Sequence, residues 1–260
     1  MPKIQVNNIE LDYEDYGKGK VLLLLHGLGS TKKDWDGQVP FFSKKYRVIT
    51  LDLRGHGDST KPLEDYGVGL MTEDVKQLLD KLTIKKATFV GFSMGGAVAF
   101  EMASKHPEYL ENLVIVNSGP DFNAMGKTGE ELLKNRTAFL ETKGVEPLAK
   151  EIAFNMFPEA HQIDMRNQFE ARCKKNDYNA YYKTFVTLMD WGLGDRIHDI
   201  STRTLVIASD MDYTPVSFKE DYVKKLPNAR LTVIKNSRHG VVIDQPEAFN
   251  VALEKFLEDE

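Results

Sequence analysis

The sequence predicts a doubly wound, mostly parallel α/β sheet with an all-helical segment inserted late in the sheet. Three observations predict this class. Short continuous apolar runs recur along the chain, as strands do when helices cover both faces of a parallel sheet. Helix-like segments alternate with these runs. The alternation stops between about residues 121 and 198, where the chain offers helix-like segments and no convincing strand.

The expected strands follow one another at short intervals. Residues 3–17 alternate in polarity and predict two short strands joined by a turn at Asn7 and Asn8. The continuous apolar runs that predict the remaining strands are VLLLLHG (21–27), YRVITLD (46–52), ATFVGF (87–92), NLVIVNS (112–118), TLVIAS (204–209) and RLTVIK (230–235).

Helix signals separate the strands. Residues 72–83 carry leucines at helical spacing, and Thr72 is the expected N-cap. Within the inserted segment, Gly144 is a signal for the end of a helix and Pro158 a signal for the start of one. Its four expected helices lie within residues 129–144, 145–156, 158–175 and 177–191. We therefore expect a core of residues 1–120 and 199–260, and a helical cap of residues 121–198 over the carboxyl ends of the strands.

Composition limits the function classes. The 260 residues are 42% hydrophobic and 28% charged, which favours an ordered chain, and the net charge of −5 argues against nucleic acid as a partner. The N-terminus lacks a signal-peptide pattern, and the aliphatic run 21–25 is too short to span a bilayer. Cys173 has no cysteine partner and is expected as a small residue on a cap helix. These features predict a soluble, cytoplasmic protein without a membrane partner, and they leave its oligomeric state open.

Gly91-Phe92-Ser93-Met94-Gly95 carries the strongest chemical signal. It fits G-x-S-x-G and lies between a predicted buried strand and a predicted helix. A very tight turn there would strain the serine backbone, and side chains two residues to either side would collide. The motif therefore predicts Ser93 as a nucleophile. The N–H of Met94 would face a developing oxyanion at the helix N-terminus.

A serine nucleophile requires a base, and the base requires an acid. His239 follows the last predicted strand and is the expected base, because it falls at the same sheet edge as Ser93. Asp212 follows another strand and is the expected acid, with Asp210 as the main alternative and Asp121 as a weaker one. The other histidines are expected to be structural, solvated or in the inserted segment: His26, His56, His106, His161 and His198.

A second oxyanion donor is expected from the loop HGLGS after the first long apolar strand. The N–H of Leu28 is the natural partner of Met94, and the glycines on either side of Leu28 allow a close backbone approach. Loops from separate strand ends thus converge on Ser93.

Taken together, these motifs resemble those of the α/β-hydrolase superfamily, in its serine hydrolase or carboxylesterase type with a helical cap. The resemblance covers nearly the whole chain, with HGLGSTKKDW, DLRGHGDS, GFSMGG, DYTP and HGVVIDQPEAF in the family's order. It implies Ser93 as nucleophile, Asp212 as acid, His239 as base, and Leu28 and Met94 as oxyanion donors. It also implies that Asp52 and Arg54 hold loops. A serine nucleophile disfavours the haloalkane dehalogenases and epoxide hydrolases of this fold, which use aspartate.

The expected activity is hydrolysis of a small-molecule carboxylic ester through an acyl-enzyme, with a small to medium apolar acyl group and no metal or organic cofactor. Alternatives are a lactonase, a carbon–carbon bond hydrolase, a perhydrolase, or a non-turnover signalling partner or receptor. Tyr181, Phe185 and Met189 form a helical stripe that we expect more readily in a core than around a pocket. The cap aromatic residues are Phe139, Phe154, Phe157, Phe169, Tyr181, Tyr182, Phe185 and Trp191.

Overall fold

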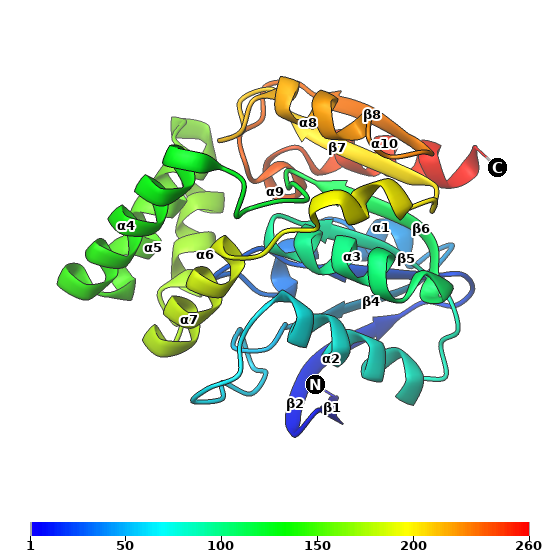
Figure 1. The fold of residues 1–260 in the computed structure, drawn as a ribbon, viewed down its shortest axis with the longest axis horizontal. Helices are drawn as coiled ribbons and strands as arrows, with labels where there is room; N and C mark the ends of the chain where they lie inside the picture. Colours follow the sequence, from blue (N-terminus) through cyan, green and yellow to red (C-terminus); the bar gives the residue numbers. More distant parts are fainter. Residues whose placement is uncertain (1, 260) are drawn as a thin grey trace.

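A single eight-stranded sheet with helices on both faces forms the centre of the computed structural model, which describes residues 2–259 (Figure 1). The strand order is β1-β2-β4-β3-β5-β6-β7-β8. The pairs β1–β2 and β2–β4 are antiparallel, and every other neighbouring pair is parallel. The predicted fold class is therefore confirmed. The strands are β1 (Lys3–Val6), β2 (Ile9–Tyr16), β3 (Val21–Leu25), β4 (Arg47–Leu51), β5 (Ala87–Phe92), β6 (Leu110–Val116), β7 (Thr204–Ser209) and β8 (Ala229–Ile234).

Helices connect the strands and cover both faces of the sheet. The α-helices of this part are α1 (Val39–Phe42), α2 (Val68–Lys81), α3 (Met94–Lys105), α8 (Val216–Val223), α9 (Val241–Asp244) and α10 (Pro246–Glu258). The 3₁₀ helices outside the four inserted helical segments are η1 (Lys32–Trp35), η2 (Pro107–Tyr109) and η4 (Gly194–Asp199).

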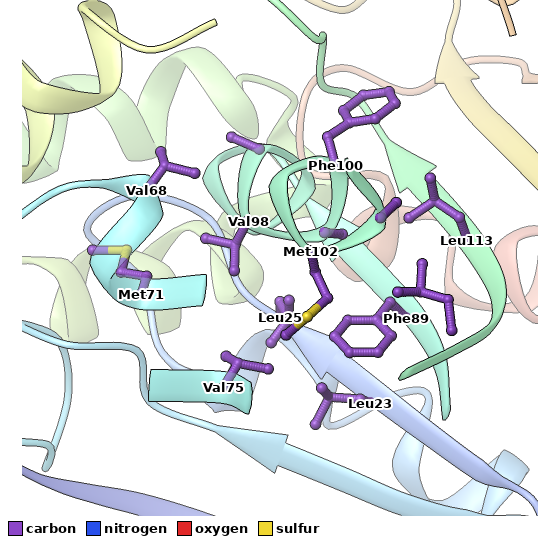
Figure 2. Packing of buried hydrophobic residues seen from close by; sticks show 14 of the residues in the cluster. Leu23, Leu25, Val68, Met71, Val75, Phe89, Val98, Phe100, Met102 and Leu113 are labelled. Atoms are coloured by element: carbon purple, nitrogen blue, oxygen red, sulfur yellow. The ribbon is translucent and has the colours of Figure 1, made fainter. Parts of the chain in front are cut away.

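The continuous apolar strands divide their side chains between two cores. In β3, Leu23 and Leu25 join the cluster that contains α2 and α3, whereas Leu22 and Leu24 join the cluster that contains α10. Each fully buried leucine contributes about 1.5–3 kcal/mol of transfer free energy, so burial on both faces explains why these strands do not alternate in polarity. Figure 2 shows the first cluster, with α2 and α3 packed against the strands around Phe89.

Two local predictions had opposite outcomes. Asn7 and Asn8 both have positive φ, as a type I′ hairpin turn requires, so the predicted hairpin is confirmed. The prediction of Thr72 as an N-cap was wrong, because α2 begins at Val68 after Gly67. Thr72 is buried inside the helix, and its hydroxyl donates to the Val68 carbonyl at 2.9 Å. Apolar packing of the first turn extends the helix to Val68.

The inserted helices follow β6 and precede β7 in the sequence. They lie together at one end of the sheet, in the left part of Figure 1. Each of the four segments predicted to be helical contains a helix. The chain enters and leaves this region side by side, with an antiparallel bridge between Asp121 and Gly192. Asn176 Nδ2 also donates to the Gly29 carbonyl at 2.6 Å and ties the helices to the sheet edge. The inserted helices are α4 (Gly126–Lys143), α5 (Val145–Met156), η3 (Ala160–Gln162), α6 (Ile163–Cys173) and α7 (Tyr178–Met189).

Candidate active site

Ser93 occupies the sharp turn between β5 and α3, with φ 51° and ψ −114°. Such a backbone conformation costs a non-glycine residue about 1–3 kcal/mol. A Cβ atom on Gly91 would overlap the Gly95 carbonyl, and one on Gly95 would overlap the Leu25 carbonyl. The predicted steric reason for the two glycines is therefore confirmed. The Ser118 hydroxyl donates to the Ser93 carbonyl at 2.7 Å and helps to hold the turn.

His239 and Asp212 meet although 27 residues separate them in the sequence. Asp212 follows β7, His239 follows β8, and His239 Nδ1 lies 2.6 Å from Asp212 Oδ1. Asp210 points elsewhere, because its Oδ1 accepts from the Ser237 N–H at 3.3 Å. The structure thus brings His239 together with Asp212 rather than with Asp210.

The ring of His239 is held on several sides. It stacks on Tyr213 with centroids 4.4 Å apart, and Phe92 lies 5.1 Å away on centroids. Asn117 Nδ2 donates to the His239 carbonyl at 2.8 Å. These contacts restrict the ring to one orientation.

Asp212 lies in a dense set of donors. Its side chain is only 1% exposed, and it accepts from the N–H of Tyr213 at 2.8 Å and from the Thr214 hydroxyl at 3.0 Å. Its Oδ2 pairs with Lys219 Nζ at 2.5 Å. Burial alone would raise the pKa of Asp212, but His239 and Lys219 outweigh it and hold that pKa well below its usual range. Asp212 is therefore an anion at neutral pH.

Lys219 is fully buried and pairs with this anion from the side opposite its contact with His239, because it reaches Oδ2 and His239 reaches Oδ1. Its ammonium also donates to the Thr214 carbonyl at 2.7 Å. Burial lowers the pKa of Lys219, and the charge of Asp212 opposes that effect.

Replacing Lys219 with Met is expected to destabilise the protein by about 3 kcal/mol, because the buried carboxylate of Asp212 loses its cation. Urea unfolding at pH 7 measures the difference. The double variant Lys219→Met/Asp212→Asn should lose less stability than the sum of the two single variants, since neither buried charge remains without its partner. Strict additivity would contradict this role of the pair.

Asp244, on α9 just beyond His239, is a second buried carboxyl with a different environment. The Ser237 hydroxyl donates to its Oδ1 at 2.7 Å, whereas its buried Oδ2 has no partner among residues 2–259. Burial raises the pKa of Asp244 to about 6, against the hydrogen bond from Ser237. The folded state therefore holds this proton up to a higher pH than the unfolded state does. Stability falls as the pH rises from about 4 to about 6.

Asp244→Asn is therefore expected to stabilise the protein above pH 6, by on the order of 1 kcal/mol, and to have little effect near pH 4. Urea unfolding across this range measures the effect. Asp199→Asn, an exposed substitution with the same change of charge, is the control and should show no such dependence. A gain that does not vary with pH would show that the carboxyl of Asp244 does not titrate in this way.

A cavity of about 150 Å³ lies beside Ser93 and His239, lined mainly by apolar side chains. In the part of the chain that the structure describes, no hydrogen bond joins the Ser93 hydroxyl to His239, although both line this space. Such contacts are often long before substrate binds. The lining consists of Leu28, Ser93, Asn117, Ser118, Gly119, Asp121, Phe122, Met125, Leu132, Arg136, Ile152, Tyr181, Phe185, Leu188, Met189, Asp212, Tyr213, Thr214, Phe218 and His239.

The helical stripe on α7, which was expected in a core rather than around a pocket, serves both purposes. Tyr181, Phe185 and Met189 pack in an apolar cluster with Leu140 and Leu148, and all three also line the cavity. A helix face at the edge of a core can serve both purposes, because one side of each side chain packs and the other remains open. The sequence pattern of a buried face cannot distinguish these situations.

The remaining histidines have structural surroundings. His26 Nε2 accepts from the Leu53 N–H at 3.0 Å, and burial lowers the pKa of both His26 and His56, the latter to about 3. His106 is only partly solvated, because its Nε2 lies 2.8 Å from Glu73 Oε1. His161 and His198 are exposed. None of these five lines the cavity beside Ser93.

The loop after β4 is held by charged side chains, as the resemblance implied. Arg54 donates to both carboxylate oxygens of Asp74 at 2.7 Å, and Asp52 accepts from the N–H groups of Lys32 and Asp58. The carboxylates of Asp12, Asp52 and Asp58 lie close enough to ligate a metal ion. The ammonium of Lys32 already lies among them, 2.9 Å from Asp52 and 3.3 Å from Asp12, and balances their charge.

From the sequence, we did not identify three residues that the structure places at or beside this site. Lys219 stood in a helix-like segment with other lysines, and only its position seven residues after Asp212 could have drawn attention to it. Asn117 followed a predicted strand, where polar residues often serve a site. Arg136 lay in a charged helix, and no signal distinguished it from its solvated neighbours.

Within residues 2–259, no helix combines the length and the apolar character that a membrane crossing needs.

Known proteins share this architecture along almost the full chain. In sequence, 3-oxoadipate enol-lactonase 2 of Acinetobacter baylyi is 28% identical over 98% of this chain and 95% of its own length. A putative carbamate hydrolase, RutD, of Caulobacter segnis is 30% identical over 92% of this chain and 91% of its own. In structure, the enol-lactonase of Burkholderia xenovorans LB400 has a TM-score of 0.92 at 25% identity and covers 99% of this chain and 100% of its own.

The sequence model described as the alpha/beta hydrolase fold matches residues 20–246, which is most of the chain. With this match, a sharp strand-to-helix turn at Ser93 and a contact between His239 and Asp212 after β8 and β7, the chain belongs to the α/β-hydrolase fold family.

Proposed function

We propose that this protein is a serine hydrolase that cleaves a carboxylic ester with a small to medium apolar acyl group. The observation that carries the proposal is the 2.6 Å contact between His239 Nδ1 and Asp212 Oδ1 beside a cavity that Ser93 also lines. This arrangement of residue types supports nucleophilic catalysis by an activated serine.

In the proposed reaction, His239 Nε2 takes the proton of the Ser93 hydroxyl as its oxygen attacks the ester carbonyl. Asp212 holds the Nδ1 proton and stabilises the imidazolium that forms. The tetrahedral intermediate collapses to an acyl-enzyme, and the leaving alcohol receives the proton from His239. Water, deprotonated by His239, then releases the acid and restores Ser93.

The oxyanion of each tetrahedral intermediate is assigned to the N–H groups of Leu28 and Met94. Met94 is the first residue of α3, so its N–H has no partner within the helix and lies at the positive end of the helix dipole. Leu28 lines the cavity from the loop after β3. Loss of one such donor costs about 10²–10³-fold in rate in serine hydrolases.

We assign residues 121–198 as the cap of this enzyme, and residues 1–120 and 199–260 as its core. Side chains of α4, α5 and α7 form much of the cavity lining, whereas the three expected catalytic residues come from the sheet edge. Excluding water with the cap would strengthen the electrostatic interactions around the ester.

A lactonase is the second candidate, because a lactone is a cyclic ester and the same steps would open it. Two relatives that match almost the whole chain are named as enol-lactonases. A further structural neighbour, Est816, is described as an N-acyl homoserine lactone degrading enzyme and matches with a TM-score of 0.85 at 26% identity.

The first test is a panel of p-nitrophenyl esters with acyl chains of two to twelve carbons. We expect saturable turnover with an optimum at short to medium chains, since a cavity of about 150 Å³ limits the acyl group. A fluorophosphonate probe should stop turnover and add one phosphonyl group to the peptide that contains Ser93. Turnover that ends after one equivalent, or a label on another residue, would contradict the proposed function and favour a non-turnover role.

A further inference from the structure

One charged side chain of the cavity has no counter-ion among residues 2–259. Arg136, on α4, is half-buried, lines the cavity, and holds its guanidinium carbon 4.9 Å from the ring centre of Phe185. Within the described part of the chain it forms no ion pair. A guanidinium beside apolar and aromatic surface loses hydration, and such a charge is normally matched by an anion.

The acidic groups that line the same cavity are already engaged. Asp121 Oδ1 accepts from the Gly194 N–H at 2.7 Å, and Asp212 pairs with Lys219 and His239. The positive charge of Arg136 is therefore not neutralised by the cavity's own carboxylates.

Tyr181, beside Arg136, provides a second sign of a missing ligand. Its side chain is only 4% exposed and lines the same cavity, and no acceptor among residues 2–259 meets its hydroxyl at hydrogen-bonding geometry, although the guanidinium of Arg136 lies within interaction range. Burial raises the pKa of Tyr181, and the nearby guanidinium of Arg136 opposes that rise. A buried hydroxyl without a partner costs about 1–3 kcal/mol, so a bound acceptor would remove this cost.

We propose that Arg136 and Tyr181 form a subsite for a carboxylate of the substrate, away from the bond that is cleaved. The natural substrate is then an ester or lactone that carries a carboxylate elsewhere in the molecule. The planar fork of a guanidinium matches a carboxylate, and the contact with Phe185 orients it before binding. A phosphate dianion would require more positive charge than this single guanidinium supplies. This inference rests on the proposed function for its reaction and deepens it by naming the substrate class.

The test uses pairs of esters that differ only in charge. Monoethyl adipate and its uncharged amide, ethyl 6-amino-6-oxohexanoate, differ in charge on the acyl side, and 4-acetoxybutyrate and 4-acetoxybutyramide differ in charge on the alcohol side; each compound has one ester bond. Hydrolysis is followed in a pH-stat for the wild type, for Arg136→Met and for Lys134→Met. Lys134 is exposed on the same helix and does not line the cavity, so its variant controls for the loss of one positive charge.

We expect the wild type to prefer the anionic member of at least one pair. Arg136→Met should lower kcat/KM for that member by about 10- to 100-fold, the range of a charge-assisted hydrogen bond, and change the neutral member by less than about threefold. Lys134→Met should change neither. Equal losses on both members, or no preference in the wild type, would overturn the carboxylate subsite.

A binding measurement separates this inference from the proposed function. Adipate is titrated into Ser93→Ala and into Ser93→Ala/Arg136→Met by calorimetry, and no turnover is needed. Binding to the first variant that weakens at least tenfold in the second supports the subsite even if no ester is hydrolysed. Failure of adipate to bind the first variant at millimolar concentration, together with uncharged esters that are cleaved well, would overturn the subsite and leave the proposed function intact.

Discussion

Ser93→Ala is expected to lower kcat by about 10⁴- to 10⁶-fold on the best ester of the panel. The hydroxyl is the only part of Ser93 that the proposed reaction uses, and alanine leaves His239 and Asp212 in contact. Removing the nucleophile leaves only the stabilisation that the oxyanion donors and the cavity give to direct attack by water. Initial rates at saturating ester, with the fluorophosphonate label on the same samples, measure the effect.

Ser118→Ala is the matched control, since Ser118 lines the same cavity and donates to the Ser93 carbonyl at 2.7 Å. Its loss removes a hydroxyl close to the reacting centre without removing the nucleophile, and we expect a change below about tenfold. If the two variants retained equal activity, another residue would carry the chemistry. Urea unfolding of both variants checks that a loss of activity does not come from a loss of the fold.

The fold and the outline of the site could be predicted because they depend on local rules. Continuous apolar strands indicate a sheet covered on both faces, and β3, β5 and β7 follow that rule. The turn at Ser93 is equally local, since Gly91 and Gly95 are needed wherever a strand turns this sharply into a helix. Such features are recorded in a few neighbouring residues and can be recognised without coordinates.

Features set by packing could not be predicted. Thr72 has the residue type of an N-cap, but the burial of Val68 and Met71 extends α2 beyond it. Lys219 and Arg136 look like ordinary surface cations in their helices, and only the folded chain places one beside Asp212 and the other on the cavity wall. Contacts between segments far apart in the sequence decide whether a charged side chain is solvated or part of a site.

The alternative between Asp212 and Asp210 shows the same limit on a smaller scale. Both follow β7, and residues two apart on an extended segment point to the same side. After the strand ends, however, the chain turns, and the N–H of Asp212 donates to the Ser209 carbonyl while Asp210 accepts from the Ser237 N–H. The turn, which the residue pattern did not specify, directs only Asp212 toward His239.

Asp212→Asn is expected to lower kcat by about 10⁴-fold. An amide in place of the carboxylate offers an N–H to His239 Nδ1, which favours the tautomer with its proton on Nε2, and that nitrogen can no longer accept the proton of Ser93. The anion that stabilises the imidazolium is lost as well. Stopped assays at pH 7 with the best ester measure the loss, and circular dichroism checks that the variant is folded, because Lys219 loses its partner.

Asp210→Asn makes the same chemical change two residues away and serves as its control. The amide oxygen can still accept from the Ser237 N–H, as Asp210 Oδ1 does now, so we expect activity within about threefold of the wild type. A large loss in Asp210→Asn with a small one in Asp212→Asn would assign the acid to the other position. Comparable losses in both would mean that the loop after β7 acts as a unit and that the 2.6 Å contact with His239 does not by itself identify the acid. A loss confined to Asp212→Asn would mean that catalysis requires the carboxylate that contacts His239.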